Sequence, residues 1–197
     1  LIIFFIGISN LILKIFGLSV TKKSPLITEE ELKTMIEMGQ EEGVLSEEER
    51  KMLHRIFEFG DTLLKDIMVP KDKIIAVSVD TNSDDLLNIF VEEGHARLPV
   101  YKDNKDNIVG IVYAQDLLYI LREKGLFLLQ DLLHEACLVS GSTRVNDLLK
   151  RFQTEKMQIA VIVDKDKKAI GLVTLEDLIE EIVGEIEEKR FIKRKHS

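Results

Sequence analysis

Apolar and polar positions follow one pattern that occurs twice along the chain. Residues 95–118, HARLPVYKDNKDNIVGIVYAQDLL, contain an apolar run, a charged turn, a second apolar run and the start of a helix. Residues 156–179, KMQIAVIVDKDKKAIGLVTLEDLI, repeat this order at a constant offset of 61 positions, so that Asp116 matches Asp177. A repeat of this kind predicts two copies of one supersecondary unit.

The flanking segments extend each copy to a complete small domain. Hydrophobic spacing predicts further elements in chain order: a short helix at 62–68, a strand at 74–79, a helix capped by Ser83 and running to Val91, a helix from Ala114 to about 123, a short helix at 129–135, a strand at 137–139, a helix at 143–154, and a last helix from Thr174 to about 189. The expected fold class is α+β, with two small three-stranded sheets and their helices. A unit of about 60 residues is marginal alone, so the two are expected to pack on each other.

An acidic helical linker is predicted at 19–61, ahead of the first copy. Thr28 with Glu31, and Ser46 with Glu49, have the spacing of a capping box, in which the two side chains satisfy backbone N–H groups at a helix start. Nine glutamates lie from the first box to the second. They form either a solvated helical face or a cation-sensing patch, and no ligand spacing separates these two interpretations.

The first 18 residues are almost entirely apolar. As a helix they would span roughly 27 Å, close to the ~30 Å hydrocarbon core of a bilayer. A signal peptide would have a basic start and a small-residue cleavage site, and this segment has neither. Residues 1–18 are therefore interpreted as the end of a transmembrane domain, with a buried core helix as the alternative. Lys14, Lys22 and Lys23 would then face the cytoplasm. Because it begins at Leu1, the chain is expected to lack an upstream part.

Composition and charge narrow the classes of partner. The chain has 35 Asp and Glu against 27 Lys and Arg, a net charge of -8, so a nucleic-acid partner is not expected. The one cysteine, Cys137, lies in an apolar strand, which favours a core role in a reducing compartment over a nucleophile. The basic end at 187–197 is either a solvated tail or a contact with a membrane surface.

The second copy carries the most specific candidate for chemistry. Its last strand, at 169–173, leads into a helix with Thr174 at the predicted N-cap, where free N–H groups and the helix dipole favour an anion such as phosphate. Asp177 lies three residues on, and its carboxylate can accept hydrogen bonds from both hydroxyls of a ribose. A nucleotide needs both groups together. The alternative is a capping box in which Thr174 and Asp177 satisfy backbone donors alone.

The repeats resemble a pair of CBS (cystathionine-β-synthase) domains, which are regulatory modules that bind adenosine nucleotides between repeats. The motifs that carry this resemblance are DIMVP at 66–70, RLPVY at 97–101, and the runs at 110–116 and 171–177. The flanking TEEEL, EEGVLSEEE, IFEFGD and EDLIEEIVGEI are similar to the bacterial CorC/HlyC group and its cyclin-M relatives. Those are membrane proteins, often labelled haemolysins, with a transmembrane domain ahead of a CBS pair and an association with magnesium and cobalt efflux.

The resemblance implies CBS repeats at 62–125 and 126–186 in a cytosolic, nucleotide-sensing module of a cell-membrane protein. ATP or AMP, with Mg²⁺, is the implied ligand. One competent site is expected at Thr174 and Asp177, and a degenerate one in the first copy, where Tyr113 replaces the threonine. Backbone groups would read the adenine edge and Arg97 would pair with phosphate or form a surface ion pair. The predicted nucleotide-binding residues are Thr174, Asp177, Ile159, Ala160, Val161, Arg97 and Asp116.

Two other functions are compatible with the same sequence. In a dimerisation scaffold, the repeats pair through apolar residues of the last helix, namely Leu178, Ile179, Ile182 and Val183, and the cleft stays empty. A homodimer is also expected of the sensing module. An enzyme ranks last, because the sequence contains no nucleophile–base pair or metal-ligand spacing.

Overall fold

The computed structural model describes residues 27–118 and 128–184. The chain divides into two compact units, Leu1–Ser46 and Glu47–Ser197. The predicted membrane segment at 1–18 and the predicted basic tail lie outside the described residues. Among the residues that are described, no helix combines the length and apolarity needed to span a bilayer.

In the part of the first unit that the structure describes, residues 27–46, the regular element is helix α2 (Glu29–Glu41). The Thr28 hydroxyl accepts a hydrogen bond from the N–H of Glu31 at 3.2 Å, and the Glu31 carboxylate accepts from the N–H of Thr28 at 2.8 Å. These reciprocal bonds satisfy two N–H groups that lack helical partners, so the first predicted capping box is confirmed.

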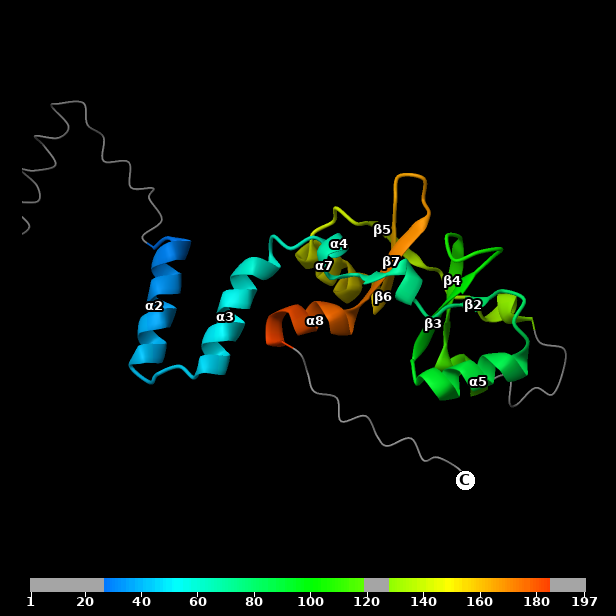
Figure 1. The fold of residues 1–197 in the computed structure, drawn as a ribbon, viewed down its shortest axis with the longest axis horizontal. Coiled ribbons are helices and arrows are strands. Elements are labelled where there is room, and N and C mark those ends of the chain that lie inside the picture. Colours follow the sequence, from blue (N-terminus) through cyan, green and yellow to red (C-terminus); the bar gives the residue numbers. More distant parts are fainter. Residues whose placement is uncertain (1–26, 119–127, 185–197) are drawn as a thin grey trace, which may run out of the picture. The chain divides into compact units, whose positions relative to one another are not determined.

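The second unit contains both repeats (Figure 1). The α-helices described in it are α3 (Glu47–Phe59), α4 (Leu64–Ile67), α5 (Ser83–Glu93), α7 (Val145–Glu155) and α8 (Leu175–Val183). Its strands are β1 (Val69–Pro70), β2 (Val77–Ser78), β3 (Arg97–Tyr101), β4 (Ile108–Tyr113), β5 (Cys137–Ser140), β6 (Ile159–Val163) and β7 (Ala169–Thr174). Short 3-10 helices occur at Lys71–Lys73, Ala114–Asp116 and Leu129–Leu132.

Each repeat forms a sheet of its own. The first has the order β2-β3-β4, with β2 parallel and β4 antiparallel to β3. The second has β5 parallel and β7 antiparallel to β6, which is the same arrangement. The predicted mixed helix-and-sheet fold with two repeats is therefore confirmed, and the offset found in the sequence is an offset between equivalent strands.

The second sheet contains four strands rather than the three expected, because β1, from the beginning of the first repeat, joins it. In this pairing Val69 lies opposite Leu172, and Pro70 lies opposite Gly171. A Cβ atom added at Gly171 would lie 2.8 Å from the Met68 Cγ and 3.1 Å from the carbonyl oxygen of Val69. Glycine is needed at this position because the crossing chain passes so closely.

The apolar faces of the two sheets and their helices form three clusters. The cluster of the second repeat joins α7 and α8 to β5, β6 and β7, and it includes Phe152, Leu148 and Leu178, each no more than 2% exposed. The cluster of the first repeat packs α5 against its own sheet through Leu86 and Phe90. A third cluster, which includes Ile111, Ile159, Val161 and Ala169, brings β4 against β6 and β7 and so joins the two repeats.

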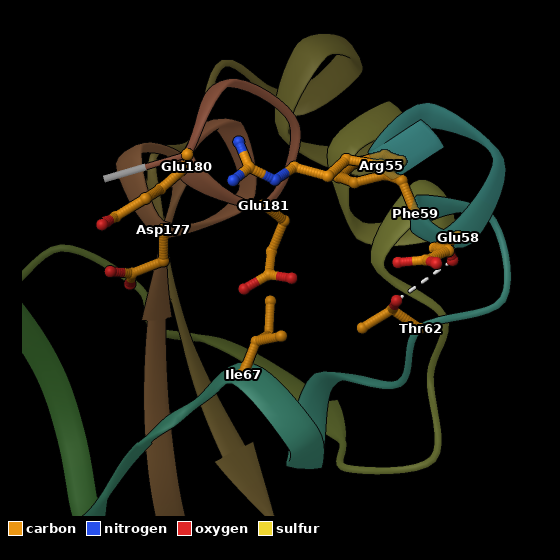
Figure 2. A pocket seen from close by; sticks show the side chains of 9 residues that line it. Arg55, Glu58, Phe59, Thr62, Ile67, Asp177, Glu180 and Glu181 are labelled. Atoms are coloured by element: carbon orange, nitrogen blue, oxygen red, sulfur yellow. Dashed lines mark hydrogen bonds between the residues drawn. The ribbon is translucent and has the colours of Figure 1, made fainter. Parts of the chain in front are cut away.

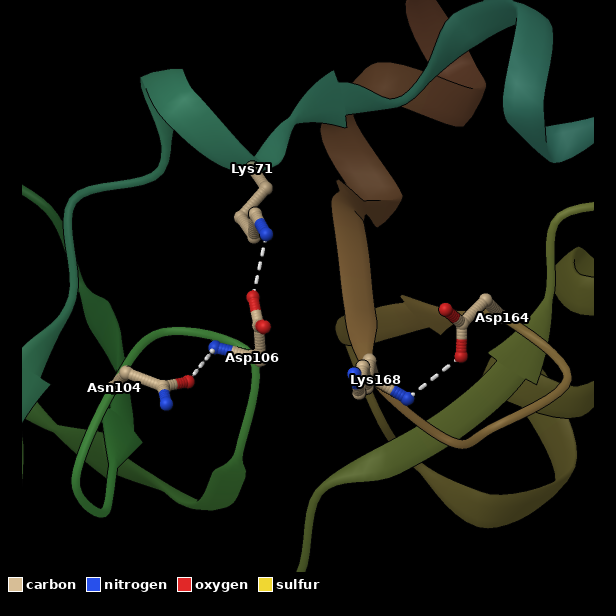
Figure 3. Close-up of polar contacts among 5 residues, drawn as sticks. All are labelled: Lys71, Asn104, Asp106, Asp164 and Lys168. Carbon is tan, nitrogen blue, oxygen red and sulfur yellow. Dashed lines mark hydrogen bonds and ion pairs between the residues drawn. The ribbon is translucent and has the colours of Figure 1, made fainter.

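Side chains close the hairpin turn of each repeat (Figure 3). Asn104 accepts a hydrogen bond from the N–H of Asp106 at 2.9 Å, and Asp164 accepts from the N–H of Lys168 at 2.9 Å. These bonds suit residues that form turns. Asp106 also pairs with Lys71, with 2.5 Å between Nζ and Oδ1, and this hydrogen bond lowers the pKa of Asp106. Lys71 thereby ties the chain after β1 to the first hairpin.

Several predicted element bounds are wrong. Helix α5 is capped by Asn82, whose Oδ1 accepts from the N–H of Asp85 at 2.9 Å, so the predicted cap Ser83 is the first helical residue. Of the predicted strand at 74–79 only Val77 and Ser78 form a strand, β2, because a 3-10 turn at Lys71–Lys73 precedes this segment. The predicted helix at 129–135 is a single 3-10 turn, and α8 ends at Val183, followed by Gly184 with a φ of 85°.

Candidate ligand-binding site

A cavity of about 490 Å³ lies between the two repeats. Its lining includes four of the residues predicted to bind nucleotide: Arg97 from the first repeat, and Ile159, Thr174 and Asp177 from the second. The three other predicted residues, Ala160, Val161 and Asp116, do not line it. Three of the four lie together because β6 begins and β7 ends at the mouth of α8, where Ile159 pairs with Thr174, while Arg97 begins β3 of the first sheet.

Thr174 and Asp177 form a complete capping box at the start of α8. The Asp177 Oδ2 atom accepts from the N–H of Thr174 at 2.6 Å and from its hydroxyl at 2.8 Å, while the Thr174 hydroxyl accepts from the N–H of Asp177 at 3.2 Å. Both side chains are half-buried and border the cavity. Among the contacts of the described residues, only Oδ2 of this carboxylate accepts hydrogen bonds, so Oδ1 remains available to a ligand. Capping and ligand binding are therefore compatible.

Apolar side chains form one wall of the cavity. They come from β1, from the segment after it and from β3, β6 and β7, namely Val69, Ile74, Ile75, Pro99, Ile159 and Leu172. A planar base can be enclosed by such a wall while its sugar reaches a polar group. The sequence interpretation did not assign Ile75, Lys73 or Glu176 to this cavity. A signal was available for the first two, since they lie within five residues of the end of the DIMVP motif.

Ala160 and Val161 are fully buried in β6. This strand pairs with β5 on one side and with β7 on the other, so the backbone groups of both residues belong to the sheet. Their side chains belong to the core of the second repeat and to the cluster between the repeats. Of the three residues predicted to read the adenine edge, the structure places only Ile159 at the cavity.

Arg97 lies where the two repeats meet. Its guanidinium donates a hydrogen bond to the side chain of Gln158 and lies 5.4 Å from the ring centroid of Tyr113. Gln158 is the position equivalent to Arg97 in the second repeat, so this contact joins matching points of the two copies. The arginine is half-buried and remains beside the cavity, where it can meet an anion.

Asp116, the counterpart of Asp177, is held away from the cavity. Its side chain accepts a hydrogen bond from the N–H of Tyr113 at 3.0 Å, and its Oδ2 lies 2.9 Å from Nε2 of His134. At 6% exposure it is the buried charged residue of the described chain. His134 is fixed in turn by two backbone hydrogen bonds with Ile111, both 2.9 Å. The first repeat thus uses its carboxylate internally. Sequence reasoning missed His134, because 18 residues separate it from Asp116.

A second cavity, of about 420 Å³, lies between α3 and α8 (Figure 2). Asp177 and Glu181 from α8 and Ile67 from α4 border it, together with Arg55 from α3. Asp177 therefore belongs to the linings of both cavities. Within the described ranges, no group of three His, Cys, Asp or Glu side chains is arranged to hold a metal ion.

Cys137 is 3% exposed in the core of the second repeat, and burial raises the pKa of its thiol. A raised pKa lowers the thiolate fraction at neutral pH, and the thiolate is the reactive form. We expect iodoacetamide to label the folded chain on the order of tenfold more slowly than the chain in urea, as measured by mass spectrometry. The chain has one cysteine, so the signal belongs to this residue. Equal rates in the two states would show that the thiol is accessible.

Comparison with known proteins assigns both parts of the chain. A family model described as the cyclin M transmembrane N-terminal domain (CNNM) matches residues 1–49. The CBS domain model matches residues 64–123 and 129–184. A structure described as the CBS domain of the bacterial CNNM/CorC family Mg²⁺ transporter is 37% identical, has a TM-score of 0.76 and covers 82% of this chain and 99% of that one. The chain belongs to the CNNM/CorC family.

Other relatives of this CNNM/CorC chain have named functions or ligands. The magnesium and cobalt efflux protein CorC of Pasteurella multocida is 37% identical over 161 residues, which cover 81% of this chain and 54% of the relative. A CNNM/CorC family CBS domain in complex with ATP is 38% identical, with a TM-score of 0.66, and covers 70% of this chain and 99% of that one. A CBS-domain pair with bound AMP from Klebsiella pneumoniae is 27% identical, with a TM-score of 0.55, and covers 62% and 99%. The chain spans about half the length of the CorC relative.

Proposed function

We propose that the cavity between the repeats binds an adenosine nucleotide, ATP or AMP, with Mg²⁺. The ribose hydroxyls donate to the free oxygen of Asp177, the base lies on the apolar wall, and the phosphates meet Arg97 and the start of α8 at Thr174. The observation that carries this proposal is the capping box of Asp177 and Thr174 at the rim of a cavity with an apolar wall.

The relatives support the choice of ligand and the wider role. CBS structures that resemble this chain contain ATP or AMP. A relative that this chain covers by half is named for magnesium and cobalt efflux. We therefore propose that the pair, with repeat bounds of 62–125 and 126–186, is the cytoplasmic regulatory module of a cell-membrane protein that transports these cations. The module binds and regulates, and no chemical step is assigned to it.

The packing of α8 against α3 offers a route from the nucleotide to the chain that precedes the repeats. Phe59 of α3 and Leu178 of α8 share one cluster. A Cβ at Gly184, just past α8, would lie 2.9 Å from Cζ of Arg55, so this guanidinium rests on the helix end. A cation there is favoured by the helix dipole. A ligand that shifts the Asp177 side chain would also alter the packing of α8 against α3. It can change the population of two conformational states only if its affinity differs between them.

Calorimetry on the 197-residue chain in a mild detergent tests the proposal. We expect saturable binding of ATP or AMP with one site per chain, because Asp116 is engaged by His134. At a ligand concentration of 100 Kd, the bound state should gain about 2.7 kcal/mol, measured as a rise in melting temperature. The absence of both heat and stabilisation would reject nucleotide sensing.

That negative result would favour the dimerisation scaffold, which one observation supports. Ile179 and Val183 of α8 are 42% and 39% exposed and lie one helical turn apart. The other two residues predicted for this interface serve the fold itself: Leu178 is fully buried, and Ile182 packs against the same cluster. The apolar face that α8 leaves exposed is thus narrower than the sequence suggested.

A further inference from the structure

We propose that a cationic recess beside the nucleotide cavity holds the terminal phosphates of a nucleoside triphosphate, and that Lys156 makes the site prefer ATP to AMP. This inference rests on the proposed function and specifies its ligand. The recess has a volume of about 390 Å³, and its lining is Ala96, Arg97, Tyr113, Ala114, Gln115, Lys156 and Gln158.

The recess continues the nucleotide cavity. Ala96 and Arg97 line both, so the two spaces adjoin along this backbone. Gln158 lies at the mouth of α8, where its carbonyl oxygen accepts from the N–H of Leu175 at 2.9 Å. A chain of phosphates that starts near Thr174 and passes Arg97 would therefore reach the recess. The single phosphate of AMP would stop short of it.

The recess and the larger cavity differ in the charge of their lining side chains. In the larger cavity, Lys73 and Arg97 are offset by Glu176 and Asp177. In the recess, Arg97 and Lys156 stand with the amides of Gln115 and Gln158, and its described lining contains no carboxylate. Opposite charges at close range in a partly enclosed space attract strongly, and ammonium and guanidinium groups form charge-assisted hydrogen bonds with phosphate. The excess negative charge of a triphosphate is therefore best placed in the recess.

The repeat explains why the recess takes phosphates rather than a second nucleoside. At the offset of 61 positions, Lys156 and Gln158 correspond to His95 and Arg97 of the larger cavity, so the recess is its counterpart in the first copy. The carboxylate that would hold a ribose there, Asp116, is buried against His134 and does not line the recess. The described lining of the recess therefore has no carboxylate for a ribose, while Arg97 and Lys156 supply positive charge.

The test compares ATP with AMP in two matched variants. Lys156 has a left-handed backbone, with a φ of 58°, and asparagine tolerates this conformation while removing the charge. Lys167 has a φ of 62°, is exposed in the second hairpin turn, and lines neither space, so Lys167→Asn is the control. Calorimetry at fixed Mg²⁺ should show ATP affinity about fivefold to tenfold weaker in Lys156→Asn, with AMP affinity unchanged within about twofold.

Lys167→Asn should match the unmodified chain for both nucleotides, and Lys156→Arg, which keeps the charge, should retain the preference for ATP. An equal loss for ATP and AMP in Lys156→Asn, or no loss for either, would overturn this inference and leave the proposed function intact. A chain that binds neither nucleotide before any substitution would overturn both.

Discussion

Replacing Asp177 by alanine should weaken nucleotide binding by about a hundredfold or more, because it removes an ionised acceptor from two ribose hydroxyls and each hydrogen bond to a charged group is worth about 1.5–3 kcal/mol. Calorimetry with ATP and with AMP measures the loss. The same substitution also breaks the capping box of α8, at a cost of about 1 kcal/mol in stability. The melting temperature of the variant should be recorded beside its affinity.

Asp147→Ala is the matched control for this experiment. Asp147 is exposed, stands third in α7 as Asp177 stands third in α8, and lines neither cavity. The control should lose a comparable or smaller amount of stability and keep its nucleotide affinity. If Asp177→Ala binds as tightly as the unmodified chain, Asp177 is a helix cap alone and the site lies elsewhere.

Replacing Leu178 by alanine should lower the free energy of unfolding by about 3–5 kcal/mol. Leu178 of α8 is fully buried in the core cluster that α7 and the second sheet also form, so its truncation leaves a cavity in a close-packed core. Urea denaturation followed by circular dichroism measures the change. The neighbouring Ile179, 42% exposed on the same helix, is the control, and its replacement by alanine should cost at most about 0.5 kcal/mol.

The Ile179→Ala variant also distinguishes a monomer from a scaffold in which two copies pair through α8. If Ile179→Ala destabilises the chain as much as Leu178→Ala, and the cost depends on protein concentration, then the exposed face of α8 is covered by a second copy. A small cost that is independent of concentration contradicts pairing through this face.

The repeat could be predicted from the sequence because its signals are local. Alternating apolar runs around a charged turn fix a hairpin, and Thr28 with Glu31 fixes a helix start within four residues. Crossings between distant segments have no local signal. The pairing of Pro70 with Gly171 joins residues far apart in the chain, and the short strand that results resembles a loop in its composition. For the same reason the strand at 74–79 was predicted too long.

In the candidate site, too, local features could be predicted from the sequence and long-range contacts could not. Thr174 and Asp177 could be identified because a helix start and its third residue are close in sequence, and the structure brings Arg97 and Ile159 to them. Burial could not be judged in this way. Val161 shares the apolar run of Ile159 but faces the cluster between the repeats, and the partner of Asp116 comes from the segment that joins the two copies.

The exchange of β1 into the sheet of the second repeat has a consequence for how the chain acquires its structure. The edge of that sheet cannot be completed until β1, which is synthesised near the start of the first repeat, has come back to it. Such a contact raises the contact order, and its loop closure has to precede the gain from pairing. The two copies are therefore bound into one cooperative folding event, and a fragment cut between them would expose the backbone groups of β7 that Val69 and Pro70 cover.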